Sequence, residues 1–316
     1  MNLESVVLQG RYEIIEKIGS GGMSNVFRAK DLKLGRMVAI KVLKDEFCTD
    51  LDFVDKFKKE AQAAAGLLGE NIVNIYDVVD EGRYHFIVME LVDGITLKEY
   101  IRIKGKLDIT EGVSIAIQVA RALKTAHAQH IVHRDIKPEN IYTDENGKIY
   151  LGDFGIARYI GEELIDYDEE KIGTPGYTAP ELLLLNTGRV LKESDYYSLG
   201  QTLYTLYTGE LMYKSISDKE LLHNNMILDK YYGFSNFKEH RLLEALIKGL
   251  LKYSVSERFN DEDIKKFIEG NNSLKRKVNM EDENNFDSPL KIYGKNLWSK
   301  SEIYDFLIKN KEKIDE

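Results

Sequence analysis

The sequence predicts an α+β fold of two lobes, a small antiparallel sheet with one main helix followed by a larger, mostly helical part. Three observations carry this prediction. Strand-like runs dominate residues 11–90, a single helical pattern interrupts them at residues 52–68, and long helical patterns dominate residues 94–269. An antiparallel sheet with helices segregated along the chain is typical of the α+β class.

The strand-like runs come first along the chain. "YEIIEKIGSGGMSNVFRAKD", residues 12–31, places alternating apolar positions on both sides of a glycine turn, and "RMVAIKVLK", residues 36–44, is a third run rich in β-branched residues. "IVNIYDVVDEG" and "YHFIVMELV", residues 72–82 and 84–92, supply two more. Helical spacing predicts one helix over residues 52–68, with an apolar face formed by Phe53, Phe57, Ala61, Ala64 and Leu68.

The second part of the chain is helical with one exception. Residues 110–129 and 193–209 are long helical patterns. Between them, "NIYTDENGKIYLGD", residues 140–153, predicts a hairpin, because an Asn-Gly pair favours the tight turn that joins two antiparallel strands. From about Gly270 the sequence is polar and lacks a core pattern, so we place a domain boundary there.

Composition and charge exclude several classes of protein. The 316 residues are 43% apolar, which is enough for a sizeable core. Lys and Arg number 44 against 53 Asp and Glu, a net charge of −9, and no basic block is long enough to grip a phosphate backbone, so we expect no nucleic-acid partner. A single Cys48, no signal-peptide pattern and no apolar run of membrane-spanning length predict a cytoplasmic chain.

The first candidate for chemistry is the glycine-rich stretch "GSGGMSNV", Gly19–Val26. Glycines let a backbone close over phosphates and point its N–H groups at them. A dinucleotide-binding turn would lead from a strand into a helix, but the next residues have a strand pattern, and no Walker-type Gly-Lys-Ser/Thr follows. The glycines are therefore expected in a hairpin, which taken alone could equally be an ordinary turn.

Further motifs follow in a fixed order. "VAIK" contains Lys41, "HRDIKPEN" contains Asp135, Lys137 and Asn140, and "DFG" begins at Asp153. In that order they resemble the signatures of eukaryotic-like (Hanks-type) protein kinases across residues 11–269. The stretches "GSGGMSNV", "VDGITLKEYI" and "DFGIAR" are most similar to the bacterial serine/threonine kinases. The resemblance implies a two-lobed kinase domain, with an N-lobe of about residues 11–90 and a C-lobe of about residues 94–269.

The resemblance implies a role for each catalytic residue. Asp135 accepts or orients the proton of the substrate hydroxyl, and Lys137 adds positive charge at the γ-phosphate. Lys41 is the cation for the α- and β-phosphates and is itself held by a carboxylate. Glu60, near the middle of the predicted helix, has the spacing for that partner, and Asp55 is the weaker rival.

The resemblance also implies ATP as the cofactor, with Mg²⁺ or, in its place, Mn²⁺. Asn140 and Asp153 supply the hard oxygen ligands that such a metal prefers. The expected nucleotide-binding residues come from the glycine-rich stretch, the third and fifth strand-like runs and the predicted hairpin: Ile18, Gly19, Ser20, Gly21, Gly22, Met23, Ser24, Val26, Ala39, Lys41, Met89, Glu90, Val92 and Tyr142.

Four of these have distinct expected tasks at the adenine. Met89 controls the depth of the pocket, and Glu90 and Val92 offer backbone groups to the purine. Tyr142 stands where the family usually has a smaller aliphatic residue beneath the ring. From the residues alone, each of them could equally be a plain core position.

A second set is expected to support the site rather than to react. The resemblance implies a buried ion pair between Glu181 and Arg258, and it implies that Asp195 holds the backbone of the catalytic loop. Thr174 is expected to bond the catalytic aspartate and lysine. His133 is expected to be a packed histidine, because the neighbouring aspartate already serves the reacting hydroxyl.

These features lead to one expected function and two alternatives. We expect ATP- and Mg²⁺-dependent phosphorylation of Ser and Thr hydroxyls in protein substrates, with autophosphorylation. A pseudokinase scaffold is the alternative, but it usually lacks one of the residues that are all present here, Lys41, Glu60, Asp135, Asn140 and Asp153. A metabolite kinase is disfavoured by Lys137 and by the stretch "GTPGYTAPE", which resemble the peptide-docking version.

The stretch "IGEELIDYDEEKIGT", residues 160–174, lies between the "DFG" and "APE" motifs and is therefore the expected activation segment. It has no Ser or Thr before Thr174 to carry the phosphate that normally contacts the arginine of such a kinase, here Arg134. We expect that charge to come in part from Asp166, Asp168, Glu169 or Glu170. A solvated acidic loop is the alternative.

Two expectations concern regions outside the reaction. Residues 270–316 are expected to form a polar linker and then an amphipathic helix, whose apolar face contains Trp298, Ile303, Phe306, Leu307 and Ile314. Arg11, Leu34 and Asp77 stand where bacterial relatives place the residues of a back-to-back N-lobe homodimer. A scattered surface leucine between rim charges is the alternative.

Overall fold

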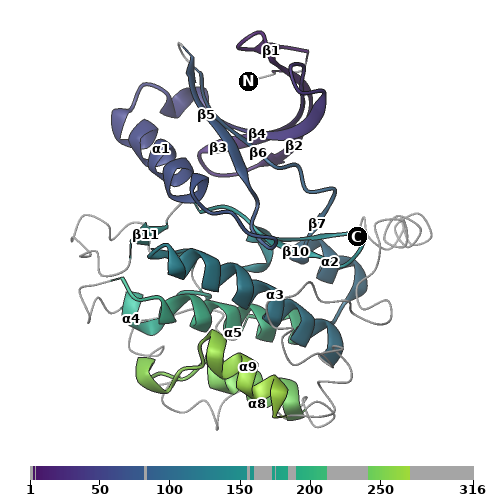
Figure 1. The fold of residues 1–316 in the computed structure, drawn as a ribbon, viewed down its shortest axis with the longest axis vertical. Coiled ribbons are helices and arrows are strands. Elements are labelled where there is room, and N and C mark those ends of the chain that lie inside the picture. The colour runs from purple at the N-terminus through teal and green to yellow at the C-terminus, as the bar shows by residue number, and fades with distance from the viewer. Residues whose placement is uncertain are drawn as a thin grey trace. The chain divides into compact units, whose positions relative to one another are not determined.

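The computed structural model describes residues 3, 5–81, 84–154, 157–159, 173–174, 176–183, 190–211 and 241–270. The chain divides into two units, one formed by Met1–Asp93 with Asp153–Gly155 and the other by Gly94–Gly152 with Ile156–Glu316. The first holds a sheet and one long helix, and the second is mostly helical (Figure 1). The predicted α+β, two-lobed organisation is confirmed.

The sheet of the first unit has six antiparallel strands in the order β1-β2-β3-β4-β6-β5. Their bounds are β1 Val7–Leu8, β2 Tyr12–Ser20, β3 Ser24–Asp31, β4 Arg36–Leu43, β5 Ile75–Glu81 and β6 Tyr84–Met89. Side chains alternate between the two faces of a strand, so neighbouring residues enter different cores. Val42 belongs to one apolar cluster, with Phe27 and Phe86, and Leu43 belongs to another, with Ile87.

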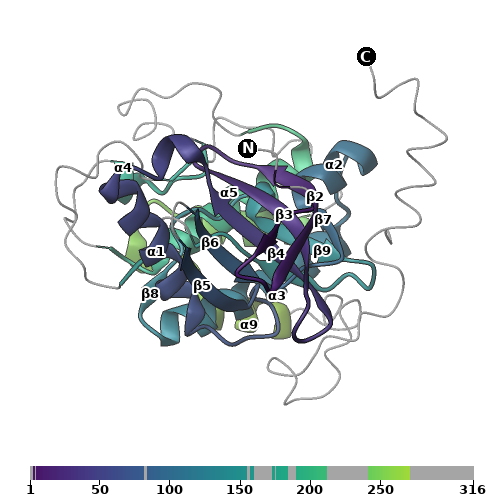
Figure 2. The same cartoon turned by 90° about the horizontal axis from the view of Figure 1, so that it is seen from above.

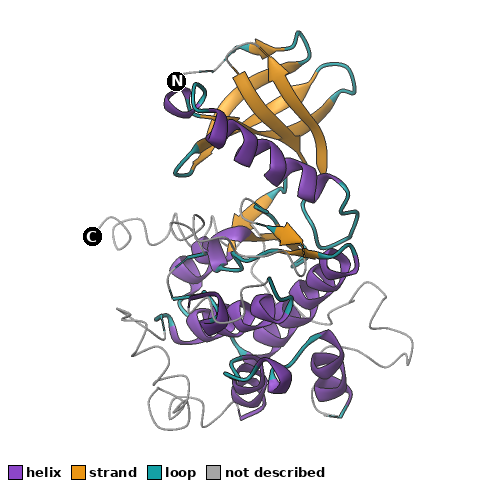
Figure 3. Cartoon of the chain, turned by 90° about the vertical axis from the view of Figure 1, so that its left-hand side faces the viewer, coloured by secondary structure: helices purple, strands orange, loops and turns teal. Residues whose placement is uncertain are grey.

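Helix α1, Leu51–Ala65, covers one face of this sheet (Figures 2 and 3). It follows a single turn of 3₁₀-helix, η1 Asp45–Phe47. The cluster that holds it consists of Leu43, Val54, Phe57, Ala61 and Ile87. Cys48 packs against this cluster, and burial raises the pKa of its thiol. Leu68 lies beyond the end of the helix and is 79% exposed, so its expected place on the buried face is wrong.

The second unit is built on helices, of which α5, α8 and α9 pack against α3. The helices are α2 Leu97–Lys104, α3 Ile109–Ala128, α4 Pro180–Leu183, α5 Glu193–Thr208, α8 Arg241–Leu250 and α9 Asp261–Glu269. Asp108 and Glu111 form a capping box at the start of α3, which satisfies backbone N–H groups there. Most of α3 is buried, including the polar residues Glu111, Ser114 and Gln118, as expected of a helix inside a core. The helical character predicted for this part of the chain is confirmed.

Short strands complete the second unit. They are β7 Gly94–Thr96, β8 Ile131–Val132, β9 Ile141–Asp144, β10 Ile149–Leu151 and β11 Arg158–Tyr159, with one-turn 3₁₀-helices η2 Pro138–Asn140 and η5 Val255–Glu257. The predicted hairpin is confirmed as β9 and β10, which meet at a turn where Gly147 has φ 76°. Two pairings were not predicted, β7 with β9 and β8 with β11.

The last described residue is Gly270, which follows α9. The expected linker and amphipathic helix of residues 270–316 therefore lie almost wholly outside the described residues, and the boundary stays a prediction. Among the helices that the structure describes, none combines the length and the apolar character needed to cross a bilayer.

Candidate active site

The segment between α3 and β9 carries the polar residues of the "HRDIKPEN" motif, and a buried carboxylate fixes its backbone. That carboxylate is Asp195, 0% exposed, in the first turn of α5. Its Oδ2 accepts from the backbone N–H of His133 at 2.9 Å, and its Oδ1 accepts from that of Arg134 at 2.8 Å. The role predicted for Asp195 is confirmed.

A third donor reaches the same carboxylate from α3. His127 Nε2 lies 2.8 Å from Asp195 Oδ2, and both side chains are buried. Because an ionised carboxylate can only accept, the proton of this contact belongs to Nε2. His127 therefore joins α3 to α5 directly beneath the loop. No local pattern predicts this contact, since 68 residues separate its partners.

His133 is a packed histidine, as predicted. Its ring is 0% exposed. The backbone N–H of Asp135 donates to His133 Nδ1 at 3.2 Å, so Nδ1 is the nitrogen without a proton, and Nε2 then donates to the carbonyl of Gly152 at 2.9 Å. The ring thus bridges two backbone segments and has no nitrogen left for an acid or base role.

Two of the motif residues have strained backbone. Arg134 has φ 68° and Asp153 has φ 59°, in the left-handed region that non-glycine residues seldom adopt. Such a conformation costs about 1–3 kcal/mol and persists only where its surroundings impose it. For Arg134, the bond from its N–H to Asp195 supplies part of that constraint. Strain of this kind is typical of functional sites.

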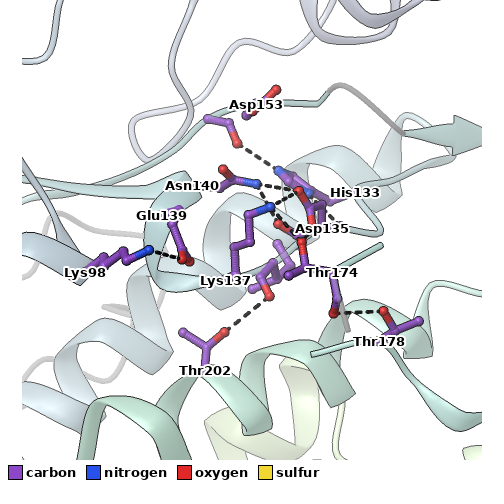
Figure 4. Close-up of polar contacts among 12 residues, drawn as sticks. Lys98, His133, Asp135, Lys137, Glu139, Asn140, Asp153, Thr174, Thr178 and Thr202 are labelled. Carbon is purple, nitrogen blue, oxygen red and sulfur yellow. Dashed lines mark hydrogen bonds and ion pairs between the residues drawn. The ribbon is translucent and has the colours of Figure 1, made fainter. Parts of the chain in front are cut away.

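Three side chains converge on the carboxylate of Asp135 (Figure 4). The hydroxyl of Thr174 donates to Asp135 Oδ1 at 2.7 Å. Lys137 Nζ donates to Asp135 Oδ2 at 2.6 Å and to Thr174 Oγ1 at 2.7 Å. Asn140 Nδ2 donates to Asp135 Oδ2 at 2.9 Å and to its backbone carbonyl at 2.8 Å. The structure therefore brings together Asp135, Lys137, Asn140 and Thr174, as the sequence predicted.

Thr174 can reach this network because Gly173 precedes it. Gly173 has φ 77°, and a Cβ atom there would lie 2.9 Å from the backbone carbonyl oxygen of Arg134. A residue with a side chain would push the segment away from the loop. The carbonyl of Thr174 also accepts from the hydroxyl of Thr178 at 3.1 Å, which ties this threonine to the stretch before α4.

Two more contacts around the loop were not predicted. Lys98, from the first turn of α2, forms an ion pair with Glu139 of the "KPEN" motif at 2.9 Å. Thr202 of α5 donates to the carbonyl of Ile136 at 3.3 Å (Figure 4). Both contacts join the loop to a helix distant in sequence, so no local pattern announces them.

In the first unit, the glycine-rich stretch forms the turn between β2 and β3, as predicted. Gly21 N–H donates to the carbonyl of Ser24 at 2.8 Å, and Gly19 lies opposite Val26. Neither Gly19, Gly21 nor Gly22 has positive φ, and the closest neighbour of a Cβ atom at any of them would be 3.5 Å away. The fold of this turn therefore does not itself require glycine at these three positions.

The tip of the turn is held by Lys44, the first residue after β4. Lys44 Nζ donates to the carbonyl of Gly22 at 2.7 Å, and the Lys44 N–H donates to the carbonyl of Met23 at 2.9 Å. The Met23 side chain packs against the α1 cluster. Met23 was predicted as a nucleotide-binding residue, and its packing shows that it also anchors the turn.

Lys41 lies on β4, opposite Val26 of β3. Its Nζ forms an ion pair with Asp153 Oδ1 at 2.8 Å, and both residues belong to the first unit. Glu60 lies in α1 as expected, but its side chain is outside the described part of the structure, so its pairing with Lys41 stays a prediction. The rival Asp55 is exposed.

The residues expected around the adenine fall in both units. Ala39, 4% exposed, pairs across the sheet with Met89, the last residue of β6. The N–H of Glu90 donates to the carbonyl of Asn74 at 2.8 Å, so it is the Glu90 carbonyl that is left to serve as the expected purine contact. Tyr142 belongs to the second unit, on β9, where it pairs with Thr96 and Tyr150.

The predicted ion pair between Glu181 and Arg258 is confirmed. Arg258, 0% exposed at its side chain, donates from two nitrogens to the two carboxylate oxygens of Glu181. Tyr177 lies in the stretch that precedes Glu181, and burial raises the pKa of its hydroxyl to about 12. That phenol stays neutral at any physiological pH. Residues 160–172 of the expected activation segment, which include Asp166, Asp168, Glu169 and Glu170, lie outside the described residues.

Comparison with known proteins gives one family match and several relatives. The family model "Protein kinase domain" matches residues 12–268. Serine/threonine-protein kinase PrkC of Bacillus subtilis is 44% identical over 204 residues, which cover 65% of this chain and 31% of the relative. A probable serine/threonine-protein kinase of Clostridium acetobutylicum is 45% identical over 207 residues, which cover 66% of this chain and 31% of the relative.

A third relative is more evenly covered. Serine/threonine-protein kinase PknL of Mycobacterium tuberculosis is 36% identical over 227 residues, which cover 72% of this chain and 56% of the relative. The matched region thus spans about a third of the first two relatives and about half of this one.

Proposed function

Because the chain belongs to the protein kinase domain family, we propose that it transfers the γ-phosphate of ATP to Ser and Thr hydroxyls of protein substrates, including its own, with Mg²⁺ as the metal. The observation that carries the proposal is the network on Asp135, in which Lys137, Asn140 and Thr174 hold one carboxylate in a fixed orientation. The serine/threonine assignment follows the names of its relatives. ATP is made in the cytoplasm, where we propose that the reaction takes place.

Asp135 is the proposed acceptor for the proton of the attacking hydroxyl. Lys137, Asn140 and Thr174 together donate to both oxygens of its carboxylate. A carboxylate held on both oxygens has one orientation, which positions a hydroxyl without reorganisation. Lys137 would also neutralise charge that develops on the transferred phosphoryl group.

The residues of the first unit are proposed to bind the phosphates and the base. Lys41 supplies a cation on a rigid strand. The three glycines supply N–H groups in a turn whose fold does not require glycine, which supports a role in letting a phosphate approach the backbone. Val26, Ala39, Met89, Glu90, Val92 and Tyr142 are the proposed adenine contacts.

Asn140 and Asp153 have suitable chemistry for the metal. The Nδ2 of Asn140 donates twice to Asp135, which directs the amide oxygen Oδ1 away from those acceptors and leaves it as a neutral ligand. Asp153 adds a carboxylate. Mg²⁺ is usually bound by one or two such groups with phosphates and water completing the shell. No group of three or more His, Cys, Asp or Glu among the described residues could form an all-protein metal cage. When bound, the metal would neutralise negative charge on the phosphates.

The decisive experiment is transfer of radiolabelled phosphate from ATP to a generic basic protein with Mg²⁺, followed by identification of the labelled amino acid. Phosphoserine and phosphothreonine should form with the wild-type chain and not with Asp135→Asn or Asp153→Asn. Label on the chain itself would report autophosphorylation. A wild-type chain that binds ATP but transfers no phosphate would favour the pseudokinase alternative.

A second variant tests the glycine turn separately. Gly22→Ala should leave folding unchanged, because a Cβ atom there meets nothing within 4 Å. It should nevertheless weaken ATP binding, because the added methyl group stands between the backbone N–H groups and the phosphates. Unchanged affinity for ATP in a folded Gly22→Ala variant would remove the proposed role of the turn.

A back-to-back homodimer through the first unit is a further part of the proposal. Leu34 is 58% exposed in the turn between β3 and β4, which supports a contact surface there. Arg11 lies 3.8 Å from Asp77 of the same chain and donates to both oxygens of Asp31, so these charges already have partners within one copy. Sedimentation at about tens of micromolar should show dimer for the wild type and monomer for Leu34→Asp. If the wild type and Leu34→Asp both sediment only as monomers, the proposed homodimer is refuted.

A further inference from the structure

Asn74 and Glu90 are joined by an unusually dense set of hydrogen bonds at the end of the β5–β6 pair. The N–H of Glu90 donates to the carbonyl of Asn74 at 2.8 Å. In the other direction, the carboxylate oxygen Oε2 of Glu90 accepts from the Asn74 side-chain Nδ2 at 2.6 Å and from the Asn74 N–H at 3.3 Å. The backbone and the side chain of each residue therefore contribute to one clamp, which we call the Asn74–Glu90 clamp.

The clamp continues the strand pairing beyond its last registered pair. Ile75 lies opposite Met89, and Asn74 and Glu90 are the next residues outward on the two strands. β5 is the outermost strand of the sheet, and the register shifts between Ile75 and Asp77. The clamp adds side-chain hydrogen bonds at the end of an edge strand, next to an irregularity in its pairing. The clamp therefore fixes the chain as it leaves β6.

A cation and a phenol lie near the Asn74–Glu90 clamp. The Arg36 guanidinium lies 3.6 Å from the ring centroid of Tyr76, two residues after Asn74. The pKa of the Tyr76 hydroxyl is raised by burial and by the negative charge of Glu90, and Arg36 opposes that rise. The Glu90 carboxylate thus lies within electrostatic range of this pair. A hydrogen bond to an ionised group is about twice as strong as a neutral one.

We propose that Asn74 is a positioning residue for adenine recognition, and this rests on the proposed function. Glu90 is the first residue after β6, and its carbonyl is the proposed acceptor for the purine. Its N–H and its carboxylate are both used by Asn74. Asn74 therefore fixes the peptide plane that carries the Glu90 N–H and the direction of the Glu90 side chain. Together these limit how the next peptide plane, which carries the Glu90 carbonyl and leads to Val92, can turn.

The variant Asn74→Ala removes the 2.6 Å bond and leaves both backbone bonds in place. A hydrogen bond to a charged group is typically worth enough to change an equilibrium about ten- to a hundredfold, and only part of that is expressed in binding. We expect the Kd for ADP and the KM for ATP to rise about three- to thirtyfold, with kcat within about twofold. The preference for ATP over GTP should fall, because a displaced carbonyl no longer selects the adenine amino group.

A reversed pair gives the conservative rescue. Asn74→Asp alone would place a second carboxylate where the amide now donates to Glu90, and it should weaken ADP binding more than Asn74→Ala does. Combined with Glu90→Gln, the carboxylate and the amide exchange places, and the side-chain bond can form in the opposite sense. The double variant should recover most of the affinity. Asn146→Ala, the same change at an exposed position of the β9–β10 turn, is the matched control and should leave ADP binding unchanged.

Calorimetric titration of the full chain with ADP and steady-state kinetics at varied ATP and GTP measure these effects, with urea unfolding to show that each variant is folded. Unchanged Kd for ADP in Asn74→Ala would overturn the inference, as would a fall in kcat at constant KM or a reversed pair no tighter than Asn74→Asp. If Asn74→Ala does not fold, the reversed pair alone decides. A wild-type chain that binds no ADP would refute the proposed function instead.

Discussion

The ion pair between Glu181 and Arg258 provides the sharpest test of how the helical unit is held together. Glu181 lies in α4, and Arg258 follows η5, 77 residues later. Two variants that keep the side-chain volume, Glu181→Leu and Arg258→Met, each remove one partner and leave the other buried. A double variant removes both charges together.

The cost of each single variant follows from the partners that remain. Removing one member of a buried pair typically costs about 3–5 kcal/mol, because the other charge is left without compensation. In Glu181→Leu, Arg258 keeps its bonds to the carbonyls of Lys252, Glu193 and Tyr253. In Arg258→Met, Glu181 keeps only the hydroxyl of Ser194 among its described partners, and the three carbonyls lose a donor. Arg258→Met should therefore be the more costly change, by about 1–3 kcal/mol.

The double variant should cost less than the sum of the two. It leaves no buried charge, so we expect it to be less destabilising than the sum by about 2–3 kcal/mol. A loss of about 3–5 kcal/mol is a large part of the stability of an ordinary domain, about 5–15 kcal/mol. The variants should therefore be studied at low temperature.

Amide hydrogen exchange of α5 and α9 is the suitable measurement. The chain has two units, so a single unfolding transition cannot be assumed, and exchange reports the opening of these helices directly. If the destabilisation of the double variant equals the sum of the two single variants within about 0.5 kcal/mol, the ion pair does not couple the two residues. A Glu181→Leu variant less stable than Arg258→Met would contradict the expected order. The exposed pair of Lys266 and Glu262 is the control, because its loss should cost little.

Three further predictions follow from close contacts. Gly94→Ala should destabilise the helical unit by about 1–3 kcal/mol or more, because the new Cβ atom would lie 1.9 Å from the Thr143 carbonyl oxygen. Urea unfolding measures this change, and an unchanged free energy of unfolding would contradict the contact. The Arg11 guanidinium lowers the pKa of Asp31 to about 2, so the stabilisation is present above the usual carboxyl pKa and is lost as pH falls through 2. Asp31→Asn should therefore be less stable than the wild type at pH 7, with a difference that narrows between about pH 4 and pH 2; a constant difference would refute it. Thr174→Val should lower kcat about ten- to a hundredfold while Thr174→Ser keeps it, and equal rates for both would remove the threonine hydroxyl from the site.

Much of the site could be predicted from sequence because its chemistry is local. Asp135, Lys137 and Asn140 lie within one short loop, and their contacts with each other need no knowledge of the rest of the fold. Asp195 and Thr174 lie farther along the chain, and only the family resemblance connected them to the loop. The long helices and the β9–β10 hairpin could be predicted because periodicity and a turn signal extend over many residues.

What could not be predicted depends on register and on short pairings. β8 and β11 have two residues each, too few to show any alternation. The bond between Asn74 and Glu90 depends on a register shift one residue inside the strand end, which no pattern of apolar residues specifies. Leu68 has the right spacing for the face of α1, yet the helix ends before it, because spacing does not say where a helix stops.

The glycines show how the structure separates two demands that look the same in sequence. Gly94 and Gly173 are required by the fold, since a Cβ atom at either position would collide with backbone. Gly19, Gly21 and Gly22 meet no such obstacle, and none has a backbone conformation that excludes a side chain. A residue type that the fold does not need is explained only by something outside the chain, and in this turn a phosphate fits that role because it must approach the N–H groups closely. Substitution of Gly94 should therefore lower the stability of the helical unit, whereas substitution of Gly22 should lower the affinity for the nucleotide. If Gly22→Ala instead destabilised the fold and left nucleotide affinity unchanged, the glycines of this turn would be required for folding.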